Sequence, residues 1–240
     1  MQVYLNEITG IPDAITSMFM SKRTWTREKE EEIRNICRST LNPNGSLHRS
    51  AEESDIEQLN KWFNTLCKWG AIHTTMLRFI DFSFTVEGLH RGGQDDLDSH
   101  AKRFENRIIR SSTRLATFDY EMSDWYKDKI IPTDMALMEL AIDTPNIIVC
   151  NGITFVKTTN GYIREDLKDN KDAKRGLYML SIPSNFIFKV NLTEYSHVYK
   201  ERNINSSANE ELKLCIEETA TQLERFHSQF NRELFMKIKN

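Results

Sequence analysis

The sequence has little cysteine, and its cysteines are not arranged for chemistry. Its 240 residues contain 4 cysteines, with no Cys-x-x-Cys pair and no Cys/His pair at the short spacing of zinc sites. No Gly-x-Ser-x-Gly motif marks a serine nucleophile, and no cysteine stands in a known nucleophile motif. We therefore expect reduced, buried thiols at Cys37, Cys67, Cys150 and Cys215.

Long apolar runs and an excess of basic charge are also missing. No stretch approaches the ~20 apolar residues of a membrane span, and the N-terminus has no basic segment followed by an apolar one. With 32 Lys+Arg against 35 Asp+Glu, the net charge of −3 argues against binding of a nucleic-acid polymer or an anionic membrane. We expect a cytoplasmic protein with neither kind of partner.

Several acidic residues and histidines lie between positions 87 and 100, but their pattern does not indicate a metal site. Asp96 and His100 are four positions apart, as on one helical face, and Glu87, His90 and Asp95 are nearby. No His-Glu-x-x-His or Glu-x-x-His pattern accompanies them. We expect no bound metal.

The apolar periodicity predicts one α+β domain over residues 1–240, with a mixed sheet flanked by long helices. No repeat, low-complexity segment or linker divides the chain. Strands are expected over residues 1–9 and Phe79–Val86. Helices are expected from Asp13, over Thr26–Leu41, from Ser54 to Gly70, over Gln94–Ile109 and Thr133–Ile142, and from Ala208 to Lys237.

A small β-insert is predicted over residues 146–166. Three β-rich runs lie there, separated by Asn151-Gly152 and Asn160-Gly161. Asn-Gly is the strongest short hairpin signal, because both residues accept the positive φ of a two-residue turn.

Two arginine-containing segments could bind anions. Gly88–Gln94 places glycines and Arg91 before the helix expected from Gln94, where free N–H groups favour phosphate; an ordinary turn is the alternative. Arg107, Arg110 and Arg114 are three and four positions apart, so that a helix would place their guanidinium forks on one face. If the end of the segment is extended instead, Ser112 and Arg114 share one side of a strand. A solvated or ion-paired basic face explains this second pattern equally well.

A polar stripe follows later in the chain. Asn191, Glu194, His197 and Glu201 fall on one helical face, with Arg202 beside it. Such a stripe is costly to bury unless its groups find partners, which favours the edge of a cofactor. An exposed helix face is the alternative.

The spacing of four residues, together with two earlier segments, resembles the flavin-dependent thymidylate synthases, the ThyX family. Arg175 follows Ala173-Lys174, and Asn191, His197 and Arg202 come 16, 6 and 5 positions later, as in that family. The segment from Gly70 to Thr75, with the strand Phe82–Val86, resembles the family's His-x-Thr segment. The resemblance implies that His73, Thr75, Asn191 and His197 contact FAD and that Arg175 and Arg202 hold a nucleotide.

The family's central motif, Arg-His-Arg-x-x-Ser-x-Asn-Glu-x-Ser-x-Arg-Tyr, is largely replaced here. Its placement on this chain aligns Lys102-Arg103-Phe104 with the first three residues and retains Ser112 and Arg114. By resemblance, Ser112 and Arg114 contact the nucleotide, whereas Arg91, Lys102 and Arg103 contact the cofactor. Arg110 falls where the family has its substrate-binding Glu.

The resemblance implies an enzyme that methylates C5 of a uracil nucleotide, of the dUMP-to-dTMP type. It would use FAD, with methylenetetrahydrofolate as carbon source and NADPH as reductant, in a homotetramer. Arg202 would be catalytic, because an arginine beside the ring stabilises charge on the uracil carbonyls. Two alternatives remain open: a flavoenzyme for another pyrimidine nucleotide or one-carbon reaction, and a non-catalytic nucleotide-binding protein.

Overall fold

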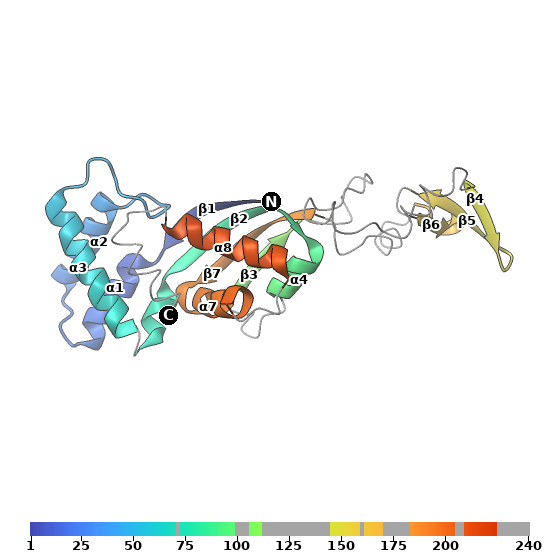
Figure 1. Ribbon diagram of the computed structural model, residues 1–240. Coiled ribbons are helices and arrows are strands. Elements are labelled where there is room, and N and C mark those ends of the chain that lie inside the picture. Colours follow the sequence, from blue (N-terminus) through green and yellow to red (C-terminus); the bar gives the residue numbers. More distant parts are fainter. Residues whose placement is uncertain are drawn as a thin grey trace.

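The computed structural model describes residues 1–70, 73–98, 106–111, 145–158, 161–169, 183–204 and 209–224 (Figure 1). The first half contains β1 (Gln2–Thr9), α1 (Ile11–Ser21), α2 (Arg27–Thr40), α3 (Glu53–Gly70), the 3-10 helix η1 (Thr74–Phe79), β2 (Asp81–His90), α4 (Arg91–Asp98) and β3 (Asn106–Arg110). The second half contains β4 (Ile147–Cys150), β5 (Ile153–Thr158), β6 (Gly161–Arg164), the 3-10 turn η2 (Glu165–Leu167), β7 (Pro183–Asn191), α7 (Leu192–Tyr199), the π-helical turn η3 (Lys200–Ile204) and α8 (Glu210–Glu224). The helix expected over Thr133–Ile142 and the end of the last helix lie outside the described residues.

A four-stranded sheet in the order β1-β2-β7-β3 forms the centre of the fold. Each neighbouring pair is antiparallel. The α+β class is therefore confirmed, although a mixed sheet was expected and these pairings are all of one kind. A mixed sheet also contains parallel pairs, and these need a crossover connection between the two strands. Here each strand runs in the opposite direction to its neighbour.

One face of this sheet holds the core. Phe82, Phe84 and Phe188 are fully buried on it, because alternate strand residues point to the same face. The α7 residue Tyr195 packs on Phe82 and Phe84 with ring centroids 5.5 and 6.1 Å apart, and its hydroxyl lies 2.7 Å from Thr219 Oγ1 of α8. The sheet thus fixes α7, and α8 is tied to α7 (Figure 1).

The opposite face of the sheet carries an exposed apolar row. Tyr4, Thr85, Ile187 and Ile109 are neighbours across the four strands. Ile109 is 75% exposed, and Ile187 and Tyr4 are about half exposed. The polar Thr85 separates Tyr4 from the two isoleucines, which are adjacent. Exposed apolar side chains grouped on one face in this way are typical of contact surfaces.

The segment expected to be a helix over Gln94–Ile109 is split. Its helix, α4, ends at Asp98, and residues 106–110 form the strand β3, which pairs with β7 in register Ile108↔Phe188. The helix prediction was therefore wrong over residues 106–109. The sheet edge offered by β7 outweighs the local sequence pattern that predicted a helix, since strand formation depends on its pairing context.

A second sheet, β4-β5-β6, forms where the β-insert was predicted. Asn151-Gly152 connects β4 to β5 with φ values of 51° and 76°, as a two-residue hairpin turn requires. In Figure 1 this sheet stands apart from the four-stranded sheet. None of the described helices combines the length and apolar character that crossing a membrane requires.

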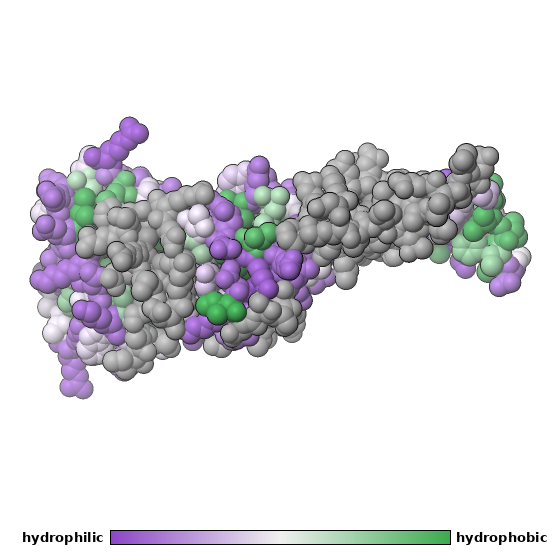
Figure 2. All heavy atoms as spheres, viewed as in Figure 1, coloured by the Kyte–Doolittle hydropathy of each residue, from purple (hydrophilic) through white to green (hydrophobic). Residues whose placement is uncertain are grey.

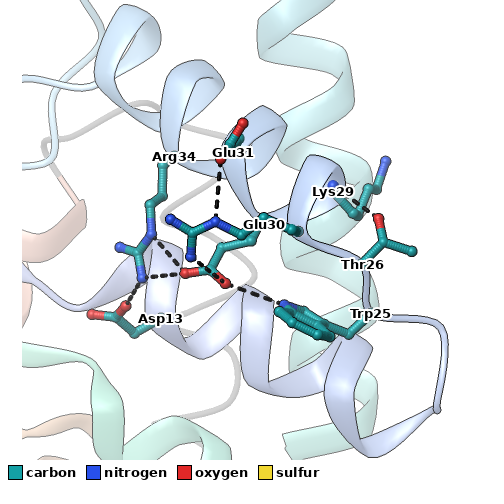
Figure 3. A network of polar contacts seen from close by, with 8 residues as sticks. Asp13, Trp25, Thr26, Lys29, Glu30, Glu31 and Arg34 are labelled. Carbon is teal, nitrogen blue, oxygen red and sulfur yellow. Dashed lines mark hydrogen bonds and ion pairs between the residues drawn. The ribbon is translucent and has the colours of Figure 1, made fainter.

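Helix α2 is anchored to its surroundings by a polar network (Figure 3). Thr26 caps the helix by accepting a hydrogen bond from the Lys29 backbone N–H. Glu30 accepts hydrogen bonds from Arg34 and from the Trp25 indole, and Arg34 also donates to Asp13 of α1 at 2.8 Å. The hydrogen bond from Arg34 is the main cause that lowers the pKa of Glu30.

This lowered pKa predicts an acid-sensitive contribution to stability. A carboxylate whose pKa is lower in the folded state stabilises the fold above its unfolded pKa and loses that effect as pH falls through the folded value. We expect the thermal midpoint to decrease as the pH is lowered from about 5 to about 3. In Glu30→Gln this decrease should be smaller. Glu31→Gln is the control, since Glu31 is exposed and bonds to Arg27 at the helix surface. Equal slopes for wild type and Glu30→Gln would contradict the assignment.

Candidate functional site

Six of the eleven predicted site residues lie in the described part of the chain, at two junctions around α7. His73, Thr75 and Asn191 lie where η1 meets the start of α7, whereas Arg91 and Arg202 lie around α4, beyond the end of α7. His197 is half-buried on α7 between them. The other five, Lys102, Arg103, Ser112, Arg114 and Arg175, lie outside the described residues.

At the second junction, helix α4 follows strand β2 directly. β2 ends at His90 and α4 begins at Arg91, so the glycine pair lies within the first helical turn rather than in a separate loop. Gly93 is buried against the His90 ring: a Cβ there would lie 2.8 Å from Cε1. This glycine therefore makes room for a side chain, which neither the turn nor the phosphate interpretation anticipated.

Arginines from three elements converge on α4. Arg110 of β3 forms ion pairs with both Asp95 and Asp98, and the Nε of Arg91 lies 3.6 Å from Asp95 Oδ1. Arg202 of η3 donates from Nη2 to the backbone oxygen of Asp96 at 2.9 Å. We call Arg91, Arg110 and Arg202 the α4 arginine cluster.

Arg110 was not among the predicted site residues, and the helical face proposed for the arginines is not formed. Because β3 is a strand, Arg107 and Arg110 point to opposite faces. Arg107 binds Asp81 at 2.7 Å, whereas Arg110 turns toward α4. The ion-paired alternative therefore describes these two residues.

Arg202 is the least satisfied member of the α4 arginine cluster. Its Nε is buried, and no acceptor lies within hydrogen-bond distance of it among the described residues. A buried donor without an acceptor costs about 1–3 kcal/mol. In a purely structural ion-pair network we would expect every buried donor to have an acceptor. The unpaired Nε of Arg202, beside the partly exposed guanidinium groups of Arg91 and Arg110, instead favours a site for an anionic or carbonyl-rich ligand such as a nucleotide.

A buried His–Glu pair supports the same junction. His90 Nδ1 contacts the Glu211 carboxylate of α8, whose Oε2 also lies 3.3 Å from the His90 backbone nitrogen. Both residues are at most 3% exposed. The pair joins the end of β2 to α8 next to Arg91, and it links positions 121 residues apart, which sequence patterns alone do not connect.

At the other junction Asn191 has a structural contact of its own. It is the N-cap of α7, and its Oδ1 accepts a hydrogen bond from the Glu194 backbone N–H at 2.9 Å. Leu192 N–H donates to Ile80 O at 2.8 Å, which ties the start of α7 to the end of η1. Asn191 is 3% exposed, so the expected polar stripe is buried at this end and exposed at Glu201.

His73 and Thr75 are both exposed, near this capped end of α7. The His73 ring stacks on Trp69 of α3 with centroids 5.6 Å apart, and Lys22 lies 4.6 Å from the Trp69 ring centroid. The Thr75 side chain faces solvent. An aromatic platform beside exposed polar groups is suited to contact with a planar cofactor.

Two of the cysteines are buried thiols that are not activated as nucleophiles. Burial raises the pKa of both Cys37 and Cys215 to about 12, so these thiols stay protonated at neutral pH. Cys67 is buried, but Cys150 is exposed, contrary to the expectation of four buried thiols. No group of three or more His, Cys, Asp or Glu residues suited to a metal occurs in the described ranges.

Two pockets on the described surface lie elsewhere. One of about 540 Å³ opens between β1, α1 and α2 and includes Arg34, Arg38 and His48. The other, about 780 Å³, lies between the N-terminus and α8. Neither contains a predicted site residue.

Comparison with known proteins supports the fold and leaves the activity open. No family model and no curated protein sequence matches the chain. ThyX from Helicobacter pylori complexed with FAD and dUMP is similar in structure, with a TM-score of 0.54 and 13% identity over 98% of this chain and 99% of that one. The fold is that of the flavin-dependent thymidylate synthases. A UMP/dUMP methylase, PolB from Streptomyces cacaoi bound with 5-Br dUMP, gives a TM-score of 0.56 at 10% identity, over 98% of this chain and 94% of that one.

Proposed function

We propose that the protein is a flavin-dependent enzyme that methylates C5 of a uracil nucleotide, of the dUMP-to-dTMP type. The observation that carries the proposal is the α4 arginine cluster, with the orphaned donor of Arg202, within a fold shared over nearly the whole chain with enzymes that bind dUMP. The solved ThyX structures hold FAD as well. Methylenetetrahydrofolate and NADPH complete the proposed reaction as carbon donor and reductant.

The described side chains have distinct roles in this proposal. Arg202 holds the nucleotide and stabilises negative charge on the uracil carbonyls as C5 becomes nucleophilic. Bound flavin supplies the hydride chemistry, which explains why no activated cysteine or serine is needed. Thr75 and His73 contact the flavin beside Trp69, and His197 orients it from α7.

Asn191 and Arg91 complete the cofactor contacts within the described residues. The Oδ1 of Asn191 accepts the hydrogen bond that caps α7, and the Asn191 side chain is proposed to contact the flavin from this fixed position. Arg91, at the start of α4, is proposed to bind a phosphate group of the cofactor. Lys102 and Arg103 are proposed for the cofactor, and Ser112, Arg114 and Arg175 for the nucleotide, by resemblance.

Assembly into a homotetramer is part of the proposal. The exposed apolar row Tyr4, Ile187 and Ile109 gives the open face of the four-stranded sheet a surface suited to a subunit contact.

A UMP-methylating enzyme is the second candidate, favoured by the likeness to a methylase that takes both UMP and dUMP. The two nucleotides differ by the 2′-hydroxyl of the ribose. Product analysis with dUMP, UMP and dCMP distinguishes these substrates.

The first test is the absorption spectrum of the purified protein between about 350 and 500 nm, with and without added FAD, followed by a dUMP titration. We expect a flavin spectrum that shifts with dUMP, because the base would lie against the flavin ring. Methylated product should then form with methylenetetrahydrofolate and NADPH. A protein that stays colourless after FAD is added, yet binds dUMP, would instead support a non-catalytic nucleotide-binding protein.

A further inference from the structure

β4 forms an unprotected edge of the three-stranded sheet. The order β4-β5-β6 leaves β4 with a partner on one side, and no other strand in the described ranges pairs with it. Its sequence, Ile-Ile-Val-Cys, lies between Asn146 and Asn151 and contains neither charge nor proline. Natural edge strands use charged residues and proline to prevent further pairing, and β4 has neither.

The hydrogen bonds of β4 show which backbone groups face outward. Lys157 N–H donates to Asn146 O at 2.8 Å, and these residues face each other in the register Ile147↔Val156. Hydrogen-bonded and non-hydrogen-bonded pairs alternate along an antiparallel ladder. The N–H and C=O groups of Ile147 and Val149 therefore point away from β5, toward the open edge.

The side chains of the same two residues are exposed. Ile147 is 57% and Val149 68% exposed, and Ile153 at the start of β5 is 42% exposed. Figure 2 shows apolar residues gathered at this end of the molecule. Both the backbone and the side chains at this edge are thus suited to accept another apolar strand.

We propose that β4 pairs antiparallel with β4 of a second copy of this chain, which joins two three-stranded sheets into one of six strands. A twofold axis opposite Ile148 places Ile147 against the partner's Val149, so that the outward backbone groups of both residues bond at once. β-Branched residues then face β-branched residues, which is a favourable cross-strand pairing. No charged residue lies in either strand, so pairing of identical copies brings no like charges together.

The register gives a direct cross-linking test. Ile148 faces its own counterpart in a non-hydrogen-bonded pair, where Cβ atoms lie about 4.5–5.5 Å apart. In a Cys150→Ser background, Ile148→Cys should form a disulfide-linked dimer of the full-length protein under mild oxidation by oxidised glutathione. Ile153→Cys in the same background is the matched control, because its exposed side chain lies on β5, away from the axis. Absence of the Ile148→Cys dimer, or equal cross-linking of the control, would overturn the proposal.

A backbone variant distinguishes strand pairing from nonspecific apolar association. Val149→Pro removes an outward N–H but no bond to β5, so the three-stranded sheet should remain. Two hydrogen bonds are lost per dimer, and we expect association of the full-length protein to weaken by about tenfold or more in analytical ultracentrifugation. Val149→Ala keeps the N–H and should dimerise more tightly than Val149→Pro, whereas Val149→Lys should prevent pairing through charge. Equal association of Val149→Pro and wild type would refute strand pairing, and nucleotide methylation is not needed for any of these readouts.

Discussion

Arg202→Ala should reduce turnover of the uracil nucleotide by at least about 100-fold and leave the protein folded. Arg202 lies in η3 with one nitrogen bonded to Asp96 O and Nε orphaned, so its guanidinium is fixed in place before any ligand arrives. A positioned cation that stabilises charge developing in the transition state is typically worth several kcal/mol. Product formation from saturating dUMP, methylenetetrahydrofolate and NADPH measures the loss.

Two further variants make this result specific. Arg202→Lys keeps the charge but loses the planar fork, and we expect it to recover little activity. Arg107→Ala removes an arginine that binds Asp81 on the opposite side of β3, and it should leave turnover near the wild-type value. Circular dichroism and the flavin spectrum establish that each variant is folded. Wild-type turnover by folded Arg202→Ala would show that the catalytic assignment of Arg202 is wrong.

The elements predicted correctly from the sequence are those fixed by local signals. Helix α2 begins after its Thr26 cap with its apolar stripe inward, and the hairpin turn at Asn151-Gly152 adopts the positive φ values that its residues favour. The strand β2 has alternating burial from Phe82 to Val86. In each case the information lies within a few residues, which is why periodicity and capping suffice.

The α4 region was predicted poorly because its partners are distant in sequence. One helix was expected over Gln94–Ile109, but Asp95 and Asp98 bind Arg110 of a strand that pairs with β7. His90 and Glu211 likewise meet across 121 positions. Only the tertiary structure brings these residues together, and local propensity gives no sign of such contacts.

The predicted site residues show the same division. Asn191 was predicted on one helical face with Arg202 beside it, whereas the structure has Asn191 as the N-cap of α7 and Arg202 in η3. The spacing gave no sign of the cap hydrogen bond of Asn191 or of the α4 backbone contact of Arg202. A sequence motif specifies residue types at intervals, whereas the atoms left available for a ligand depend on contacts within the fold. The carboxylates of α4 matter for this reason, since any anion binding to Arg91 or Arg110 competes with them.

The largest effect on stability is expected at Gly10, between β1 and α1. Gly10 has φ +79°, and a Cβ placed there would lie 1.7 Å from the backbone oxygen of Phe79. Because both atoms belong to the backbone framework, no side-chain rotation relieves the overlap, and either α1 or η1 has to move.

Gly88 separates this overlap from the cost of positive φ alone. Its φ is +81°, but a Cβ there would make an ordinary contact 3.5 Å from Met1 Cα. Gly88→Ala should therefore lose about 1 kcal/mol, the cost of the left-handed conformation. Gly10→Ala should lose about 3 kcal/mol or more, since it adds the displacement of packed backbone to that cost. Urea unfolding of both variants measures the difference in the free energy of unfolding. Equal losses in the two variants would mean that the backbone at Phe79 moves to accommodate the added methyl group at little cost.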